Sequence, residues 1–371
     1  MTAPVIAVSL GHLTSFEAGL GEFGRRLGEG LAARVDVFAA RGFTLAFHMV
    51  ESLHGAFGPR VAYFPYRSSQ LAWAPSLAGC VLWHNTFQHA ATAPPATALH
   101  RLLTVHDLNY RYTRRGPGAW RSELVTRLAI RRSNRLVAIS DFVAEDVRRH
   151  IAPRSICTTI HNGATDLSSG PRTPVESLVG RPFFFHVSRM AATKNVDSIV
   201  ALARAWPERQ FVLAGPAWGD SKALHDELGT SLSNLRVLLG IDDASKAWLL
   251  ANCEAFLFPS FAEGFGLPPI EAMHFGTPVF LARRASLPEV GGHEAAYFDD
   301  FAPAAMRAVI ETELPRLQSR RDAIRRQANR FDWDVCIDRY TALYFAMLGG
   351  RDDPDAGAGL EATNAREGVE S

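Results

Sequence analysis

Short apolar runs alternate with longer helical patterns through the first 298 residues, and this alternation leaves few folds open to the chain. The runs are rich in β-branched and aromatic residues and are apolar on both faces, which is typical of strands in a parallel sheet covered on both sides. We predict a first set of strands at Val5–Ser9, Val35–Ala39, Val61–Phe64, Cys80–Trp83, Leu102–Val105, Leu136–Ile139 and Cys157–Ile160. We predict a second set at Phe183–Val187, Phe211–Ala214, Val237–Leu239, Ala255–Phe258, Val279–Leu281 and Ala296–Phe298.

A stretch rich in Gly, Ser, Pro and Thr, residues 161–182, separates the two sets and has no sustained apolar period. Such composition is typical of an interdomain linker. Two strand–helix sets of similar size predict an α/β protein of two doubly wound Rossmann-like domains that face each other across a cleft. We predict an acceptor-side domain at 1–165, a nucleotide-sugar-binding domain at 166–332, a helix at 333–348 that returns to the first domain, and a disordered tail at 349–371.

The overall composition excludes several classes of protein. The chain has 371 residues with 39 basic and 38 acidic side chains, a balance that argues against a general nucleic-acid binder. Its four cysteines lie far apart and form no C-x-x-C pair, so we expect neither a structural zinc site nor a disulfide framework. The first residues lack the pattern of a signal peptide, and no run approaches the length of a membrane span. We therefore expect a cytoplasmic protein.

Gly19, Gly21 and Gly24 spell G-x-G-x-x-G, the spacing of a dinucleotide-binding turn. The first predicted strand ends near Leu10, and eight residues, GHLTSFEA, separate that end from Gly19, whereas a dinucleotide turn follows its strand almost directly. Asp36 also stands at the start of the next predicted strand, where the nucleotide-binding acid would stand at its end. Three interpretations remain open: an NAD site, close helix packing, and a flexible glycine loop beside a phosphate-bearing ligand.

The segment FPSFAEGFGLPPIEAMHFGTPV places Glu263 just after a predicted buried strand and Glu271 eight residues later. Pro268 and Pro269 suit the first turn of a helix, where backbone N–H groups lack helical partners. The amides of Gly264, Phe265, Gly266 and Leu267 at this helix opening predict a phosphate site. Glu263 lies on the loop, from which its carboxylate can accept hydrogen bonds from ligand hydroxyls.

A second polar segment, FFFHVSRMAATKN, places Arg189 just past a strand and Lys194 at the start of the next helix. Two cations at the carboxyl end of a strand suit a diphosphate, because Arg offers a fork of donors and Lys a point charge.

With these two segments the chain resembles the retaining family-4 glycosyltransferases of GT-B fold, whose signature is E-x7-E. The resemblance covers roughly residues 1–348 and is strongest from 183 to 290. It implies that Glu263 contacts the donor sugar, that Glu271 contacts the nucleotide ribose, and that Arg189 and Lys194 stabilise the leaving nucleoside diphosphate.

The resemblance extends to further positions. His106 follows a strand in LLTVHDLNY, where a family histidine faces the donor sugar. Gly19 and Gly21 match a glycine loop near the phosphates, and we expect Gly240 and Ile241, at the end of a strand, to meet the nucleotide base. The expected catalytic residues are therefore Glu263, His106, Arg189 and Lys194, and the expected donor-binding residues are Gly19, Gly21, Gly264, Phe265, Gly266, Leu267, Glu271, Gly240 and Ile241.

Arginines and aromatic residues are interleaved in residues 111–121, and Arg131 and Arg132 follow. This composition suits either an anionic membrane surface or a phosphorylated glycolipid acceptor. We therefore also consider a peripheral contact with the inner membrane face, and we expect no nucleic-acid partner.

The resemblance implies a glycosyltransferase that moves a sugar from a nucleotide-sugar donor to a saccharide or glycolipid acceptor with retention, like enzymes that build bacterial envelope polysaccharides. We expect no cofactor and no metal, because Arg189, Lys194 and the helix opening supply positive charge to the diphosphate. UDP-glucose, UDP-GlcNAc and GDP-mannose remain open as donors, with GDP-mannose favoured. The alternatives are an NAD-dependent oxidoreductase and a silent sugar-nucleotide-binding subunit.

Overall fold

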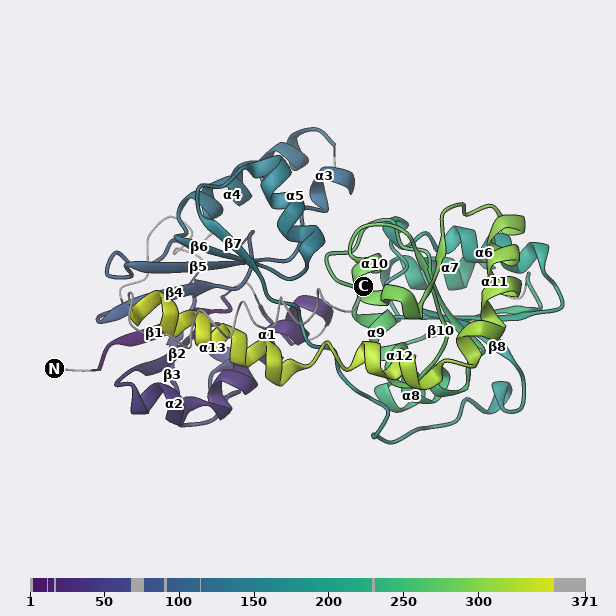
Figure 1. Cartoon of the computed structure of the whole chain (residues 1–371), viewed down its shortest axis with the longest axis horizontal. Helices are drawn as coiled ribbons and strands as arrows, with labels where there is room; N and C mark the ends of the chain where they lie inside the picture. Colours follow the sequence, from purple (N-terminus) through teal and green to yellow (C-terminus); the bar gives the residue numbers. More distant parts are fainter. Residues whose placement is uncertain are drawn as a thin grey trace. The chain divides into compact units, whose positions relative to one another are not determined.

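The computed structural model describes residues 3–349 with the exception of 12, 17, 68–76, 90–91, 114 and 229–230. The chain divides into two compact units, residues 1–163 with 332–371 and residues 164–331 (Figure 1). The break between Gly163 and Ala164 lies two residues before the predicted boundary at 165. The predicted tail, apart from Gly349, lies outside the described residues.

Unit 1 is built on a seven-stranded parallel sheet in the order β3-β2-β1-β4-β5-β6-β7. Its strands are β1 (Val5–Ser9), β2 (Thr44–Met49), β3 (Ala62–Pro65), β4 (Cys80–Asn85), β5 (His100–Val105), β6 (Arg135–Ala138) and β7 (Ile156–Thr159). The chain reverses its strand order next to β1, which is the arrangement of a doubly wound fold.

The helices of unit 1 include one from the end of the chain. They are α1 (Ala18–Ala33), α2 (Val35–Ala40), α3 (Tyr110–Thr113), α4 (Pro117–Arg131), α5 (Asp141–Ile151) and α13 (Trp333–Gly349). Helix α13 packs against α1, and its Ile337 and Tyr340 lie in one buried cluster with Phe23 and Leu27 of α1. Helix α13 is therefore part of unit 1, although it lies at the other end of the chain.

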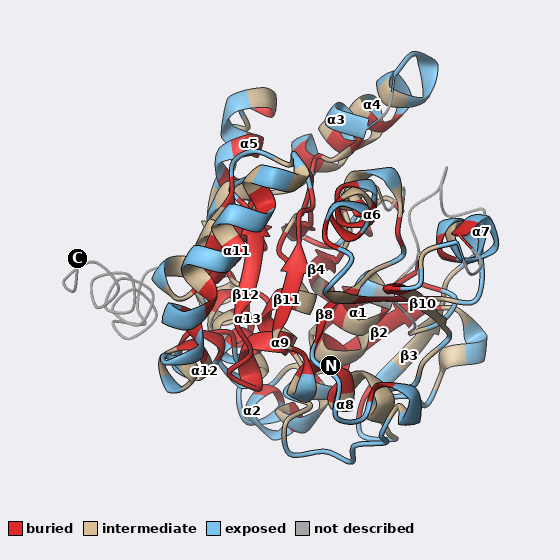
Figure 2. Cartoon of the chain, turned by 90° about the vertical axis from the view of Figure 1, so that its right-hand side faces the viewer, coloured by how far each residue is buried: buried red, intermediate tan, exposed pale blue. Residues whose placement is uncertain are grey.

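Unit 2 contains a six-stranded parallel sheet in the order β10-β9-β8-β11-β12-β13. Its strands are β8 (Phe183–Val187), β9 (Gln210–Gly215), β10 (Leu235–Leu239), β11 (Ala255–Phe258), β12 (Val279–Ala282) and β13 (Ala296–Phe298). Its helices are α6 (Val196–Ala205), α7 (Gly219–Leu228), α8 (Asp243–Asn252), α9 (Leu267–His274), α10 (Leu287–Gly291), α11 (Pro303–Gln318) and α12 (Arg321–Ala328). Strands β11 and β12 are fully buried, whereas α11 exposes one face (Figure 2).

One predicted strand is wrong. Residues Val35–Ala39 form helix α2, in which Val35 and Phe38 are buried three positions apart, at helical spacing. Gly42 follows with a φ of +79°, and the backbone N–H of Phe43 returns to the carbonyl of Phe38, which closes the helix end. The strand that pairs with β1 is the next apolar run, Thr44–Met49.

This correction removes one argument against a dinucleotide turn. Asp36 lies in α2, and β2 ends at Met49 with Glu51 two residues beyond. The loop argument remains, because β1 ends at Ser9 and α1 begins only at Ala18.

Candidate functional site

The polar residues of unit 2 that the sequence singled out follow the carboxyl ends of β8 and β11, which are neighbours in the sheet. After β8 the chain passes through Ser188 and Arg189 to a short 3-10 turn, Ala192–Lys194, and then enters α6. The two loops are joined by backbone and side-chain bonds: the N–H of Phe261 and the hydroxyl of Ser260 both donate to the carbonyl of Thr193, at 2.7 and 3.1 Å.

Lys194 and Glu263, predicted as two catalytic residues, form an ion pair. The Lys194 Nζ donates to the Glu263 Oε1 at 2.6 Å, and the two side chains are only 18% and 11% exposed. The same ammonium lies 5.6 Å from the ring centre of Phe258, the last residue of β11. A paired, half-desolvated charge is held in one orientation, so a ligand meets both groups already positioned.

Arg189 is placed differently from Lys194. Its side chain is exposed, and its guanidinium has no hydrogen-bond or ion-pair partner within the described ranges of the chain. Its five N–H donors are therefore available to an anionic ligand at the end of β8.

The turn that carries Arg189 is held by the buried His186 and the half-buried Ser188. His186 Nδ1 lies 2.8 Å from the carbonyl oxygen of Leu257, and its Nε2 lies 2.7 Å from the Ser188 hydroxyl, which in turn accepts from the N–H of Met190. Burial lowers the pKa of His186 to about 4, so the imidazole is neutral at pH 7. Sequence reasoning missed His186 and Ser188, although both flank the predicted strand end.

The loop that carries Glu263 is held by Ser286, which follows strand β12 in the chain. The Ser286 hydroxyl lies 3.1 Å from the carbonyl oxygen of Glu263 and 2.6 Å from that of Phe265. Gly266 then adopts a φ of +115° and opens helix α9, with Pro268 and Pro269 in its first turn as predicted. Because prolines carry no N–H, the donors of this helix opening are reduced to amides such as that of Leu267.

Of the predicted phosphate-binding amides, one belongs to a residue whose side chain is part of the core. Phe265 is 3% exposed, and its ring packs edge-on against Phe331 at 5.4 Å. Only its backbone can therefore contribute to a ligand site.

Backbone strain concentrates around these loops. Four non-glycine residues among those described have positive φ, and three of them, Met190, Asn195 and Ala285, lie in the turns that carry Arg189, Lys194 and Ser286. Such conformations cost about 1–3 kcal/mol each and persist where the surroundings over-determine them, typically at functional sites.

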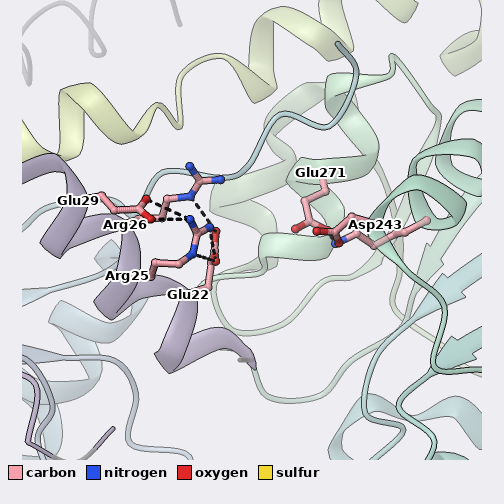
Figure 3. A network of polar contacts seen from close by, with 7 residues as sticks. Glu22, Arg25, Arg26, Glu29, Asp243 and Glu271 are labelled. Atoms are coloured by element: carbon pink, nitrogen blue, oxygen red, sulfur yellow. Dashed lines mark hydrogen bonds and ion pairs between the residues drawn. The ribbon is translucent and has the colours of Figure 1, made fainter. Parts of the chain in front are cut away.

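Glu271, the second predicted glutamate, lies on α9 and contacts a lysine that sequence reasoning missed. The Lys246 Nζ on α8 lies 3.3 Å from the Glu271 Oε2 and 3.2 Å from the Asp243 Oδ1, two carboxylates labelled in Figure 3. Burial lowers the pKa of Lys246, but attraction by Glu271 and Asp243 outweighs it and raises that pKa overall. The one sequence signal near Lys246 was Asp242, which predicts the start of α8, the helix that carries this lysine. The Asp242 carboxylate caps the helix by accepting a hydrogen bond from the Ser245 N–H at 2.7 Å.

Gly240 and Ile241 lie at the end of β10, directly before the start of α8. Gly240 has a φ of +63°, which an L-residue adopts only with strain, and its N–H donates to the carbonyl of Gly215 at 2.8 Å. The turn is thereby fixed beside the neighbouring strand β9.

In unit 1, His106 follows β5 and is buried. Its Nε2 lies 2.8 Å from the carbonyl oxygen of Thr86, so this nitrogen carries the hydrogen, and its ring meets Phe23 edge-on at 4.7 Å. Burial lowers its pKa to about 4, which makes the imidazole neutral at pH 7. In this tautomer Nδ1 is an acceptor, and it has no hydrogen-bond partner among the described residues.

Gly19 and Gly21 do not form the expected glycine loop, because both lie in the first turns of α1. A Cβ on Gly21 would stand 2.5 Å from the backbone of Phe16, and one on Gly24 would stand 2.4 Å from Leu13. A Cβ on Gly19 would meet nothing within 4 Å. The close-packing interpretation therefore accounts for Gly21 and Gly24.

The outer face of α1 next to these glycines is charged. Glu22 accepts hydrogen bonds from Arg25 and Arg26, and Arg25 also pairs with Glu29 at 2.9 Å (Figure 3). Burial lowers the pKa of Arg25, but its two carboxylate partners outweigh this and raise it overall.

The basic and aromatic stretch is divided between α3 and α4. Arg111 pairs with Glu123, and the Tyr110 hydroxyl donates to the same carboxylate at 2.9 Å. Trp120 and Leu124, in contrast, are 69% and 43% exposed, and Arg114 lies outside the described residues.

Residues 173–330 match the sequence profile of the family "Glycosyl transferases group 1". The match contains all predicted site residues of unit 2, from Arg189 to Glu271.

Curated relatives include the O-antigen chain mannosyltransferase B of Escherichia coli, 28% identical over 56% of this chain and 60% of that protein. Another is the GDP-mannose:cellobiosyl-diphosphopolyprenol alpha-mannosyltransferase of Komagataeibacter xylinus, 28% identical over 61% of this chain and 59% of that protein. The chain thus spans about 60% of the length of these two relatives.

Solved structures share the architecture across nearly the whole chain. The sucrose-phosphate synthase of Thermosynechococcus elongatus superposes with a TM-score of 0.71 at 18% identity, covering 93% of this chain and 99% of that one. The Anabaena HepE protein, solved in complex with UDP and glucose, superposes with a TM-score of 0.68 at 18% identity, covering 93% and 99%. The predicted GT-B fold, with two doubly wound α/β domains, is confirmed.

Proposed function

Through residues 173–330 the chain belongs to the glycosyl transferases group 1, and on this basis we propose that the protein is a retaining GT-B glycosyltransferase of family 4. It transfers a hexose from a nucleotide-sugar donor to a saccharide or glycolipid acceptor in the synthesis of a bacterial envelope polysaccharide. GDP-mannose is the favoured donor, because the curated relatives are named as mannosyltransferases.

The Lys194–Glu263 pair carries this proposal. It places one cation and one carboxylate, 2.6 Å apart, at the ends of adjacent strands, with the exposed guanidinium of Arg189 on the same loop as the lysine. A nucleotide-sugar matches both kinds of group, because its diphosphate binds cationic side chains and its sugar hydroxyls donate to hydrogen-bond acceptors such as a carboxylate. As the glycosidic bond to the diphosphate breaks, Lys194 and Arg189 stabilise the charge that develops on the leaving group.

Glu271 and Lys246 extend the site toward the nucleoside. A carboxylate held by a lysine keeps one oxygen oriented while the other accepts hydrogen bonds, which suits the two adjacent hydroxyls of a ribose. Gly240 and Ile241, at the end of β10, then lie next to the base. In unit 1, the neutral His106 supplies the Nδ1 acceptor for a hydroxyl of the donor sugar.

No metal is required in this scheme, because the cationic side chains and the opening of α9 supply the charge that a divalent ion supplies elsewhere. Activity in the presence of EDTA equal to that with added Mg²⁺ or Mn²⁺ is the expected result. Loss of activity with EDTA and its return with either metal would contradict this part of the proposal.

A donor screen tests the function directly. The protein is incubated with GDP-mannose, UDP-glucose or UDP-GlcNAc and lipid-linked acceptors, and the product is analysed by mass spectrometry and by NMR of the anomeric proton. We expect transfer from one donor with the anomeric configuration retained. Turnover of NADH without transfer would favour the oxidoreductase alternative, and nucleotide-sugar binding without any product would favour a silent binding subunit.

A contact with the membrane follows if the acceptor is lipid-linked. Within the described part of the chain no helix is long and apolar enough to span a bilayer. The exposed Trp120, Leu124 and Leu128 lie four residues apart on α4, and Arg121, Arg131 and Arg132 accompany them. An apolar stripe with flanking cations is the pattern of a helix that rests on an anionic lipid surface.

A further inference from the structure

Trp218 lies in the loop between β9 and α7, and 61% of its surface is exposed. The other two tryptophans of unit 2 pack on the sheet. The ring centre of Trp206 lies 5.7 Å from that of Phe184. The ring centre of Trp248 lies 6.2 Å from that of Phe183. The indole of Trp218, in contrast, stacks on no ring among the described residues. A single exposed apolar side chain is common on protein surfaces, so the position of this indole decides what it can bind.

The loop of Trp218 lies between two loops of the predicted donor site. The sheet order puts β9 between β8 and β10, so the chain after β9 runs between the turn of Arg189 and the turn of Gly240. The Gly240 N–H donates to the carbonyl of Gly215, the last residue of β9, at 2.8 Å. The hydroxyl of Ser221, a buried residue of α7, lies 3.5 Å from the carbonyl oxygens of both Arg189 and Trp218.

Close packing holds these loops together as well. Gly215 leaves no room for a side chain, because a Cβ at this position would stand 2.7 Å from the carbonyl oxygen of Ser188. On the other side, a Cβ on Gly240 would stand 3.6 Å from the Cβ of Ala217. The segment 215–218 therefore packs against the chain that follows β8 and also against the end of β10, which fixes the position of the backbone that carries the indole.

The proposed nucleotide runs along the same edge of the sheet. Its diphosphate binds Arg189 after β8 and its base lies next to Gly240 after β10, so the nucleoside passes the loop after β9. Trp218 is the one aromatic residue in the three loops that follow these strands, residues 188–195, 216–218 and 240–242. An aromatic ring binds a nucleobase face to face, because every base presents a π-face. An exposed indole at this position matches that ligand.

We propose that the indole of Trp218 stacks on the nucleobase of the donor and gives the site a preference for a purine. The inference rests on the proposed function for the place of the nucleotide. Guanine and indole are both bicyclic, so guanine can cover the whole face of the indole. Uracil has a single ring and leaves part of that face in water. Because stabilisation grows with the apolar area removed from water, Trp218 contributes more to the affinity for GDP than to that for UDP.

Binding of bare nucleotides tests the inference without an acceptor and without transfer. GDP and UDP are titrated into the full chain by calorimetry, and inorganic pyrophosphate serves as a ligand that has the phosphates but no base. Trp218→Ala should weaken GDP binding at least about tenfold, weaken UDP binding less, and leave pyrophosphate binding unchanged. Val179→Ala is the matched control, because Val179 is a 54% exposed apolar side chain of unit 2 outside these loops. It should change none of the three affinities.

Tryptophan fluorescence gives a second measure of stacking. GDP should quench part of the emission of the wild-type chain, because a base stacked on an indole quenches its excited state. Trp218→Phe keeps an aromatic ring, so it should bind GDP within about threefold of the wild type, and it should lose this quenching. Since Trp218 is exposed, thermal melts of both variants should match the melt of the wild type.

Several results would overturn the inference. Equal GDP affinity in the wild type and in Trp218→Ala would contradict stacking and would leave the proposed function intact. Tighter binding of UDP than of GDP, or an equal loss of both in Trp218→Ala, would contradict the purine preference. Loss of pyrophosphate binding in Trp218→Ala would show that the residue acts through the turn of Arg189 and not on a base. Absence of binding of either nucleotide to the wild type would contradict the proposed function, and this inference with it.

Discussion

At the scale of single residues, the site of unit 2 is organised by the partly buried ion pair of Lys194 and Glu263. Each residue is the other's main neutralising neighbour among the contacts of this loop, so changing one alters the charge that the other presents. Glu263 is proposed to accept hydrogen bonds from the donor sugar, and Lys194 to bind the diphosphate. We therefore expect these two roles to be coupled.

Glu263→Gln should reduce transfer by about a hundredfold or more while the chain still folds. The amide keeps the volume and one oxygen acceptor, but it removes the charge that orients Lys194. Initial rates with the accepted donor measure the loss, and a thermal melt measures folding. Near wild-type turnover in a folded variant would show that the carboxylate has no part in the reaction.

Arg189→Ala and Lys194→Ala should each reduce transfer by roughly a hundredfold, the scale of losing a charge contact in the transition state. They should differ in stability: Arg189 is exposed and unpaired in the described structure, whereas Lys194→Ala leaves the buried Glu263 without its cation. Arg204→Ala, on an exposed side chain of α6, is the matched control. Full activity in both site variants would mean that the diphosphate binds elsewhere.

At the scale of elements, α1 and α4 each carry a sequence pattern whose meaning depends on what lies beside the helix. The glycines of α1 permit close packing, and the leucines of α4, which recur at helical spacing, lie on its solvent side. Ser122, Thr126 and Ile130 are the buried residues of α4 instead.

Gly21→Ala should destabilise the protein, whereas Gly19→Ala should not. The Cβ at position 21 would clash with the backbone of Phe16, and overpacking of this kind costs about 1–3 kcal/mol. The Cβ at position 19 meets open space, so alanine should be neutral or stabilising by up to about 1 kcal/mol through helix propensity. Chemical denaturation measures both, and equal destabilisation by the two changes would refute the packing interpretation.

Trp120→Ser and Leu124→Ser on α4 should each weaken sedimentation with anionic vesicles by about tenfold or more, since burying such a side chain is worth about 1.5–3 kcal/mol. Ile156→Ser is the matched control, because Ile156 is 64% exposed on β7, outside α4. Sedimentation that does not depend on either α4 residue, or that is equally lost with Ile156→Ser, would exclude α4 as the membrane-facing helix.

At the scale of the whole molecule, three buried histidines make stability depend on pH. Burial lowers the pKa to about 3 for His84 and to about 4 for His106 and His186, from 6.5 in the unfolded chain. The unfolded state therefore binds more protons below pH 6.5, and stability falls as pH decreases from about 6.5 toward 4.

Each of these histidines contributes a slope of about 1.4 kcal/mol per pH unit within that window. The expected result is a constant melting temperature between pH 7 and 8 and a steep fall below pH 6.5. His84 on β4 contacts the Tyr344 hydroxyl of α13 and should account for part of this fall in melting temperature. His84→Gln should therefore reduce the pH dependence of the stability of unit 1. An unchanged melting temperature at pH 5 would show that these imidazoles are accessible to protons in the native state.

The sequence by itself determined the α/β class, all strands except one, and the residues at the ends of β8 and β11. Apolar runs bounded by turn residues are local signals, and parallel strands align their carboxyl ends at one edge, so motif residues after strands meet without further information. Helix α2 was mistaken for a strand because a short apolar run is compatible with both periods, and only the partners of Val35 and Phe38 decide between them.

The tertiary structure alone decided which side chains became partners. Lys246 meets Glu271 from a helix 25 positions earlier in the chain, and Ser286 reaches back to the loop of Glu263, and neither contact has a local sequence signal. The same holds for the exposed leucines of α4, since burial depends on what other elements bring close. Periodicity determines which face a side chain occupies, whereas packing determines what that face meets.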